Sequence, residues 1–407
     1  RDTDTDRDGY TNEDPGEDLN GDGLLTMMRI QAPDGEYVVH PADARVLRKA
    51  TAADPPAMRY HLLPEGKDND RDGQHSEDGP GGIFFNKNWT FQHPTFKPGA
   101  GEYAVSEVET RALADFLYDR FNIFSVITFG PSENLQAPLE YRPANDRQRV
   151  ISGILRGDAA VNKQVSDLYQ EVASAKKGAR ASTSPGGFME WTYFHYGRFG
   201  FGTPGWYVPD WQMPEDEAEA AQYKPNNDKN ADVNFLRWAE SAGVDNAFVE
   251  WTQVEHPDFP DQTVEVGGIA PFVQLNPPYS EVRELAAQHT DFAVRLSQLR
   301  AQVALTNVRQ EQVDDGLWRV KATLVNTGQL PTTSEIGDQF NWVKRLRVDF
   351  TMADKQALST GQEVYLFPAM QPGEARELSW LVRGNGTVTI EAGAPHIGTD
   401  SITLTLQ

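Results

Sequence analysis

Hydrophobic and polar positions change their spacing along this chain, and each change predicts a different element. Leu113 and Leu117 recur at helical spacing, which predicts an amphipathic helix over residues 107–120. Ser106 and Glu109 have the spacing of a capping box, in which a hydroxyl and a carboxylate bond free amides at a helix start. The first regular element after the acidic N-terminal part is therefore predicted to be a helix.

An apolar run over residues 124–129 follows, and it predicts a short strand buried in a parallel sheet. A second helix is predicted across residues 145–175, because Val161, Val165, Leu168 and Val172 recur there on one face. Ser280 and Glu281 begin a third predicted helix, which reaches about Leu299. Helices that alternate with buried strands are typical of an α/β sandwich.

From Gln302 onward the apolar residues recur with period two. Residues 317–326 and 402–406 alternate in this way between glycine and proline turns. Several short alternating strands over about a hundred residues are typical of an immunoglobulin-like β-sandwich. The chain is therefore predicted to contain two domains, residues 1–300 and residues 301–407.

Composition narrows the classes of function. The 407 residues carry a formal net charge of -23, which disfavours binding to nucleic acid and to anionic membranes. The hydrophobic fraction of 39% indicates a folded protein, and no apolar run is long enough for a membrane span. The chain has no cysteine, which excludes disulfides and thiolate metal sites.

Acidic residues alternate with other residues, and a glycine follows, in three segments near the N-terminus. This spacing is typical of loops that wrap oxygen ligands around calcium, and the glycine permits the sharp turn. Three copies predict calcium-binding loops inside an insertion of about residues 1–80, although solvated acidic turns have a similar composition. The candidate ligands are Asp4, Asp6, Asp8, Glu13, Asp14, Asp18, Asn20, Asp22, Asp68, Asp70, Asp72, Glu77 and Asp78.

A glycine-rich aromatic segment carries a resemblance to a known family. Residues 186–193 read Gly-Gly-Phe-Met-Glu-Trp-Thr-Tyr, and Gly197 and Gly205 follow. The segment resembles the part of zinc carboxypeptidases that runs from Gly-Gly-x-x-Asp-Trp-x-Tyr to the general-base glutamate. The resemblance implies a mixed sheet sandwiched by helices, and it places Gly205 where that glutamate is expected.

Further landmarks of the same family occur in order. Residues 86–89, Asn-Lys-Asn-Trp, are similar to the family's Asn-Arg-Asn-Trp, which implies substrate-binding roles for Asn86, Lys87 and Asn88. Lysine at position 87 keeps the charge of arginine but loses its two-pronged grip on a carboxylate. Gly130 stands where the family has a zinc-ligand histidine, and Ser182 stands where a tyrosine closes over the substrate.

The resemblance implies that the first two zinc ligands form a His-x-x-Glu pair, expected on an N-terminal segment that precedes Arg1 and holds the first sheet strands. His40 is followed by Pro41-Ala42-Asp43 and does not match this pair. Zinc hydrolysis requires three protein ligands, a base and a positive group. Catalytic zinc is therefore not expected on this chain.

Other polar residues give weaker signals. His93, His195 and His256 lie in aromatic or proline-rich surroundings and are interpreted as hydrogen-bonding histidines rather than metal ligands. Ser132 and Glu133, with Asn134, form a polar loop beside Gly130 that is predicted to contact a small molecule.

The sequence thus predicts a calcium-stabilised, metallocarboxypeptidase-like pseudoenzyme with a binding or structural role and a peptide or glycan ligand. It is expected outside the cell, at the cell surface or in the periplasm. One alternative is an active zinc metallocarboxypeptidase whose His-x-x-Glu pair lies on a missing N-terminal segment. Another is a subunit of an extracellular filament or surface assembly that associates with itself or with its own N-terminal fragment.

Overall fold

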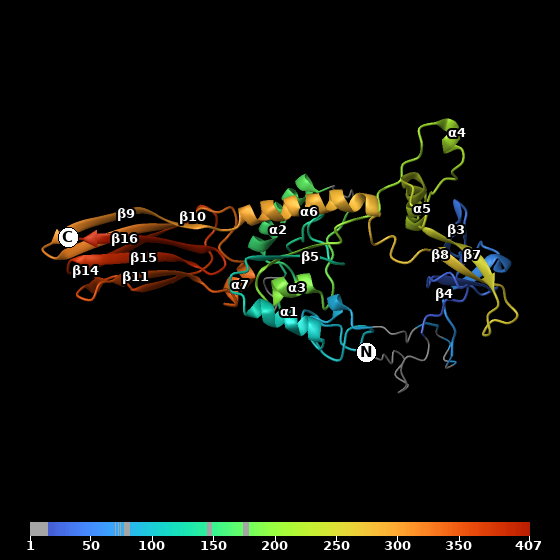
Figure 1. Cartoon of the computed structure of the whole chain (residues 1–407), viewed down its shortest axis with the longest axis horizontal. Helices are drawn as coiled ribbons and strands as arrows, with labels where there is room; N and C mark the ends of the chain where they lie inside the picture. Colours follow the sequence, from blue (N-terminus) through green and yellow to red (C-terminus); the bar gives the residue numbers. More distant parts are fainter. Residues whose placement is uncertain are drawn as a thin grey trace. The chain divides into compact units, whose positions relative to one another are not determined.

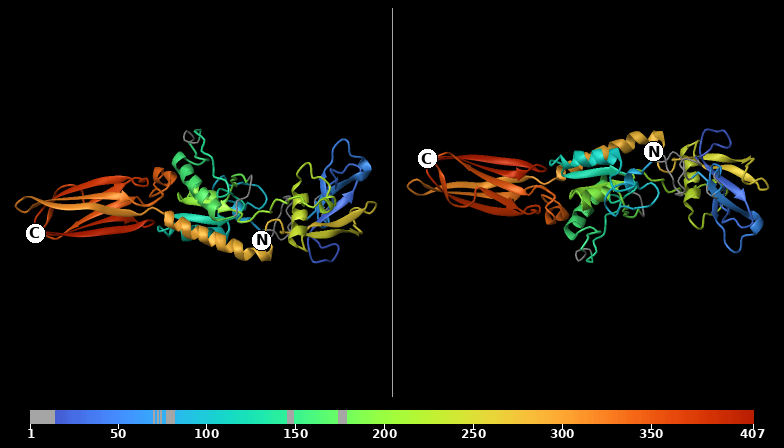
Figure 2. Two further views of the ribbon diagram at one scale, coloured as in Figure 1. Left: turned by 90° about the horizontal axis from the view of Figure 1, so that it is seen from above. Right: turned by 90° about the horizontal axis from the view of Figure 1, so that it is seen from below.

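A computed structural model gives the fold of the chain and describes residues 15–69, 71, 73, 75–76, 82–144, 149–173 and 179–407. The chain forms two compact units, and each unit is built from two stretches that are separate in the sequence. The first unit consists of residues 1–82 and 206–284, and the second consists of residues 83–205 and 285–407. Figures 1 and 2 show the elements of each unit, coloured by sequence.

The first unit is built on a six-stranded antiparallel sheet with the order β3-β2-β4-β1-β8-β7. Met28 and Ile30 on β1 pack with Val264 and Val266 on β8, and all four side chains are fully buried. The strands are β1 Met27–Gln31, β2 Tyr37–His40, β3 Asp43–Lys49, β4 Arg59–Pro64, β7 Phe248–Val254 and β8 Val264–Ile269.

Short helices accompany this sheet. The N-terminus of α5 is capped by the Asn230 side chain, which accepts hydrogen bonds from two backbone amides. The helix ends at Gly243, whose φ of 69° is the left-handed conformation that glycine adopts without strain. The helices of this unit are η1 Pro56–Met58, α4 Glu217–Ala220 and α5 Ala231–Ala242.

The second unit contains a small parallel sheet of β5 and β6 that lies between helices on both faces (Figure 1). Val126 of β5 packs against the buried cluster of α1 and α3, whereas Ile127 packs against that of α2 and α6. Glycines at positions 200 and 202 let α3 approach β6, since a Cβ at either would collide with Met189. The elements are η2 Phe85–Lys87, α1 Val108–Tyr118, β5 Ser125–Phe129, α2 Arg156–Val172, α3 Phe188–Phe194, β6 Phe199–Thr203 and α6 Tyr279–Leu299. Residues 279–284 of α6 belong to the first unit and the rest of the helix to the second.

A β-sandwich of two four-stranded sheets completes the second unit, with the orders β12-β14-β10-β9 and β13-β11-β15-β16. Trp380 and Phe350 stack face to face between the two sheets, with ring centroids 4.5 Å apart. The elements are β9 Val303–Asp314, β10 Leu317–Asn326, α7 Glu335–Gln339, β11 Leu346–Met352, β12 Ala357–Thr360, β13 Val364–Phe367, β14 Ala375–Arg383, β15 Gly386–Ala394 and β16 Gly398–Leu406. The prediction of α/β structure followed by a β-sandwich is thus confirmed at this coarse level.

Two local predictions were wrong. Ser106 does not cap α1, because its hydroxyl donates to Glu107 and accepts from the Asn88 amide. The second predicted helix begins only at Arg156, where α2 starts. Residues 149–155 precede it in extended or irregular conformation, and the Leu155 amide donates to the Tyr193 hydroxyl.

None of the helices in the described residues combines the length and the apolar character that a bilayer crossing requires.

Candidate functional site

The strand ends of β5 and β6 bring together residues that the sequence resemblance had singled out separately. The amide of Gly130 donates to the Thr203 carbonyl, so the two parallel strands end side by side. A Cβ at Gly130 would lie 3.1 Å from the Asn86 amide nitrogen, and one at Gly205 would lie 2.8 Å from the Phe129 ring. We call Asn86, Phe129, Gly130 and Gly205 the strand-end surface.

Two side chains of the strand-end surface are available to a ligand. The Phe129 side chain is 56% exposed, which is unusual for a large aromatic residue at the end of a sheet strand. The Asn86 side-chain oxygen accepts a hydrogen bond from the Phe188 amide, which fixes its orientation. Its amide nitrogen makes no hydrogen bond to any described residue, so it remains a donor beside Gly130.

Lys87 and Asn88 are held by their own loop. The Lys87 ammonium donates to the Pro98 carbonyl and lies 4.7 Å from the centre of the Phe84 ring. Asn88 is completely buried, and its amide donates to the carbonyls of Ala100 and Tyr103. Asn88 therefore fixes the loop that presents Asn86 and faces away from solvent.

Ser182 and Glu133 pair through their backbones beside the strand-end surface. Each amide donates to the other residue's carbonyl. The Glu133 carboxylate is buried and accepts hydrogen bonds from the Thr203 hydroxyl and the Leu135 amide. Ser132 and Asn134 are also buried, and a contact of this loop with a small molecule stays a prediction.

His289 is a residue of this region that the sequence analysis missed. It lies on α6, and its Nε2–H donates to the Gly205 carbonyl over 2.8 Å. Its ring contacts Phe129 edge to face and stacks on Tyr169. Because His289 precedes Phe292 and Leu296 on the buried side of α6, helical periodicity was a signal that could have revealed it.

Glu190, from the Gly-Gly segment, is a buried carboxyl behind the strand-end surface. One of its oxygens accepts the Ser184 amide at 2.7 Å, and the other has no hydrogen bond of ordinary geometry to any described residue. Burial raises the pKa of Glu190, while the nearby Ser132 hydroxyl lowers it in part. Burial thus disfavours the charged form of Glu190, the form that metal ligation uses.

The acidic loops of the first unit are described in part. Asp18 accepts hydrogen bonds from the amides of Gly21 and Gly23, and Asp68 accepts from those of Arg71 and Gly73, so both follow the same spacing. Asn20 and Asp22 lie within the first of these turns. The other predicted ligands lie outside the described residues: Asp4, Asp6, Asp8, Glu13, Asp14, Asp70, Asp72, Glu77 and Asp78.

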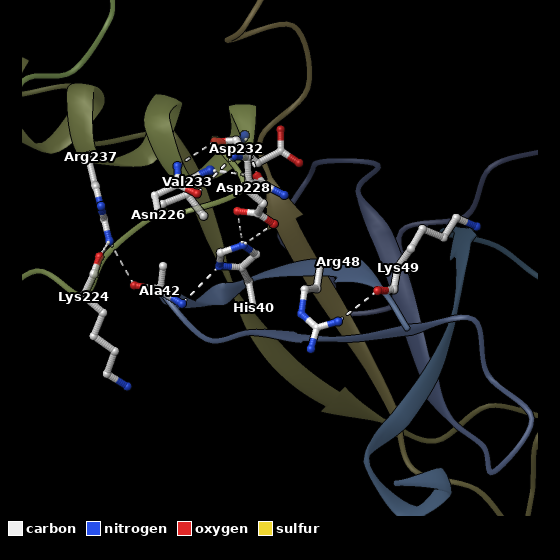
Figure 3. A network of polar contacts seen from close by, with 11 residues as sticks. His40, Ala42, Arg48, Lys49, Lys224, Asn226, Asp228, Asp232, Val233 and Arg237 are labelled. Atoms are coloured by element: carbon white, nitrogen blue, oxygen red, sulfur yellow. Dashed lines mark hydrogen bonds and ion pairs between the residues drawn. The ribbon is translucent and has the colours of Figure 1, made fainter. Parts of the chain in front are cut away.

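The histidines considered in the sequence have identifiable partners. His93, His195 and His256 each make a hydrogen bond, to Ala100, Thr90 and Gly66 respectively, which confirms that part of their interpretation. His40 donates from Nε2 to Asp228 and accepts the Ala42 amide at Nδ1, as Figure 3 shows.

The His40 hydrogen bonds belong to a network that joins two parts of the first unit (Figure 3). Arg237 of α5 donates to the carbonyls of Ala42 and Lys224. The His40 imidazole lowers the pKa of Asp228 and thereby favours its charged form. The network therefore fixes the segment before α5 against the turn between β2 and β3.

Comparisons with known proteins identify one domain. Residues 302–405, which contain β9 to β16, match the family model described as Domain of unknown function (DUF8731). A search of curated proteins gave no match.

Solved structures resemble only parts of the chain. A GH3 beta-glucosidase from Bifidobacterium adolescentis is 15% identical over 26% of this chain and 17% of its own, with a TM-score of 0.15. DesR, a beta-glucosidase from Streptomyces venezuelae, is 12% identical over 26% of this chain and 15% of its own, with a TM-score of 0.16. The Pseudomonas fluorescens alkylpurine DNA glycosylase AlkC is 15% identical over 30% of this chain and 38% of its own, with a TM-score of 0.17. The matches thus span well under half of each of these chains.

Proposed function

We propose that this chain is an extracellular, calcium-stabilised relative of zinc carboxypeptidases in which the strand-end surface binds peptides without cleaving them. The observation that carries the proposal is the meeting of Asn86, Gly130 and Gly205 beside the exposed ring of Phe129. Residues far apart in the sequence, selected only by resemblance, form one surface. The surface offers a free amide donor, accessible backbone and an aromatic ring, which together suit an extended peptide.

The packing of the motif segments supports the proposed relationship. The Trp89 amide donates to the Gly186 carbonyl, and the Trp89 and Trp191 rings lie 4.6 Å apart. Gly186 has a φ of 73° and meets the Lys87 backbone so closely that no Cβ fits. Gly186 therefore lets the Asn-Lys-Asn-Trp segment approach closely and reach the end of β5.

The proposal assigns no hydrolysis to the strand-end surface. Glycine at positions 130 and 205 offers neither a metal ligand nor a base. Glu133 is held by the Thr203 hydroxyl and by the Leu135 amide of its own loop. Lys87 is bound to Pro98 and Phe84, so its charge is not directed at a scissile bond.

A peptide-library binding assay on the full chain, in calcium-containing buffer, tests this function. We expect micromolar binding of short peptides, weakened at least tenfold by Phe129→Ala and by Asn86→Ala. The matched control is Leu366→Ala, which removes a side chain of similar exposure, 58%, from β13 of the sandwich. Equal binding by Phe129→Ala and wild type would overturn the peptide site. Release of a C-terminal residue by the purified protein would instead establish a carboxypeptidase. Binding of the protein to glycan arrays but not to peptides would show that the ligand is a glycan.

A further inference from the structure

Two histidines and an aspartate meet in the first unit, away from the strand-end surface. His75, His256 and Asp258 each offer a ligand atom, and these atoms all lie within 4.8 Å of one another. The Asp258 Oδ2 atom is 3.6 Å from Nε2 of His75 and 3.6 Å from Nδ1 of His256. In the described residues, no other group of three such side chains lies this close together.

Backbone partners fix the proton on His256. Its Nε2 lies 3.0 Å from the Gly66 carbonyl, which can only accept, so Nε2 carries the hydrogen. Its Nδ1 accepts the amide of Asp258 over 3.2 Å, so Nδ1 carries the lone pair. The Nδ1 lone pair therefore points toward Asp258, and a metal ion bound there would replace the hydrogen bond from the Asp258 amide. A histidine that donates one nitrogen to a carbonyl is typically oriented to bind a metal through the other.

His75 is buried, and neither of its ring nitrogens bonds a residue that the structure describes. It is only 8% exposed, and both Nδ1 and Nε2 lack a hydrogen bond to any described residue. Its ring stacks on Phe259 with centroids 5.5 Å apart, which fixes the plane of the imidazole. An unpaired buried polar group destabilises a fold, so a ligand that bonds one of the His75 nitrogens would stabilise this unit.

Asp258 supplies the charge and the opening to solvent. Its side chain is 29% exposed, whereas those of His75 and His256 are almost completely buried. The Asp68 amide donates to Oδ2 over 3.1 Å and orients the carboxylate. A site with three protein ligands and one side open to water matches the usual coordination of zinc.

We propose that His75, His256 and Asp258 bind one divalent transition-metal ion of the zinc class. Ligand atoms around tetrahedral zinc are separated by about 3.3 Å, so the two 3.6 Å separations require only small movements. Imidazole nitrogens select zinc-like ions over calcium, which prefers oxygen ligands. The ion joins His75 to the segment at residues 256–259, and this structural role is independent of the strand-end surface.

Zinc titration of the full chain tests the site. Protein stripped of metal and returned to excess calcium is titrated with ZnCl₂ by calorimetry, and bound zinc is counted by mass spectrometry. We expect one zinc ion per chain. His75→Phe retains the stacking on Phe259 but removes both nitrogens, and Asp258→Asn retains the acceptor for Asp68; each should weaken binding at least tenfold.

His61→Ala is the matched control, because His61 also lies beside a carboxylate, 3.2 Å from Asp34, but forms no group of three possible ligands with the side chains that the structure describes. It should bind zinc as wild type does. Co²⁺ should give intense visible bands typical of tetrahedral coordination in wild type and not in His75→Phe. Absence of zinc binding at micromolar concentrations, or wild-type affinity in His75→Phe, would overturn the site.

Discussion

Asp158 shows how one buried carboxylate can fix a junction between elements. It lies on α2, and it accepts hydrogen bonds from the amides of Glu335 and Ile336 at the start of α7 and from the Tyr193 hydroxyl. The Ser334 hydroxyl donates to the Gly197 carbonyl next to it. These contacts attach the loop between β10 and β11 to the helical layer. Burial raises the pKa of Asp158 to about 6, although the hydrogen bonds from Glu335, Tyr193 and Ile336 act in the opposite direction.

Asp158 should make stability depend on pH. In the folded state it stays protonated up to about pH 6, whereas in the unfolded chain it ionises near pH 3.8, the usual pKa of an aspartate. The free energy of unfolding should therefore fall as pH rises through that window, by about 3 kcal/mol at most. Denaturant unfolding at pH 4 and pH 7 checks this: the wild type should lose more stability than Asp158→Asn. Identical pH profiles for the two proteins would contradict the assignment.

Individual residues were predictable where a local pattern determines them. The resemblance placed Gly130, Gly205 and Asn86 in order along the chain, and the structure brings them together. It could not show that Asn88 is buried, because its partners Ala100 and Tyr103 come from a loop without a recognisable pattern. The pairing of His75 with His256 was equally hidden, since it depends on segments far apart in sequence.

Elements were predictable where periodicity and burial agree. The sandwich strands β10 and β16 were predicted because their apolar residues alternate. The start of α2 was not, because Ile154 and Leu155 continue the apolar pattern but pack in the cluster of Phe91 before the helix begins. Sequence alone cannot distinguish an apolar residue in a helix from one that precedes it in an extended segment.

The acidic loop at residues 18–23 carries a prediction at this scale. Backbone amides, first that of Gly23, lower the pKa of Asp18 and keep its carboxylate charged. Clustered carboxylates repel one another unless a cation lies between them. A chelator should therefore lower the melting temperature by about 5 °C, and excess calcium should restore it.

Asp18→Asn should lose most of this calcium response, whereas Asp34→Asn, a change at an exposed acidic residue outside the loop, should retain it. The measurement is a thermal melt of each variant with chelator and with calcium. If excess chelator leaves the melting temperature of the wild type unchanged, the proposal that calcium stabilises the chain is wrong.

The whole molecule divides into two units with separate cores. The cluster of Met28, Ile30, Val264 and Val266 belongs entirely to the first unit. The sandwich and helical clusters that the structure describes belong entirely to the second. Cores that share no residues are expected to unfold as separate cooperative units.

Scanning calorimetry of the full chain should therefore show two transitions. Chelation should move only the transition of the first unit, because the acidic loops belong to it. Asp158→Asn should move only the other, because Asp158 and α7 lie in the second unit. One transition that both treatments shift together would show that the units unfold as one.

The pairing of β1 with β8 governs how the chain can fold during synthesis. Met27 lies opposite Gly267, so the ribosome must add some 240 residues after β1 before its partner emerges, which takes about 10–50 s. During that delay one edge of β1 has no neighbour, and such an edge invites pairing with other nascent chains. The acidic segments around β1 give every unfinished molecule the same charge, and mutual repulsion would keep these molecules apart until translation supplies the missing strand.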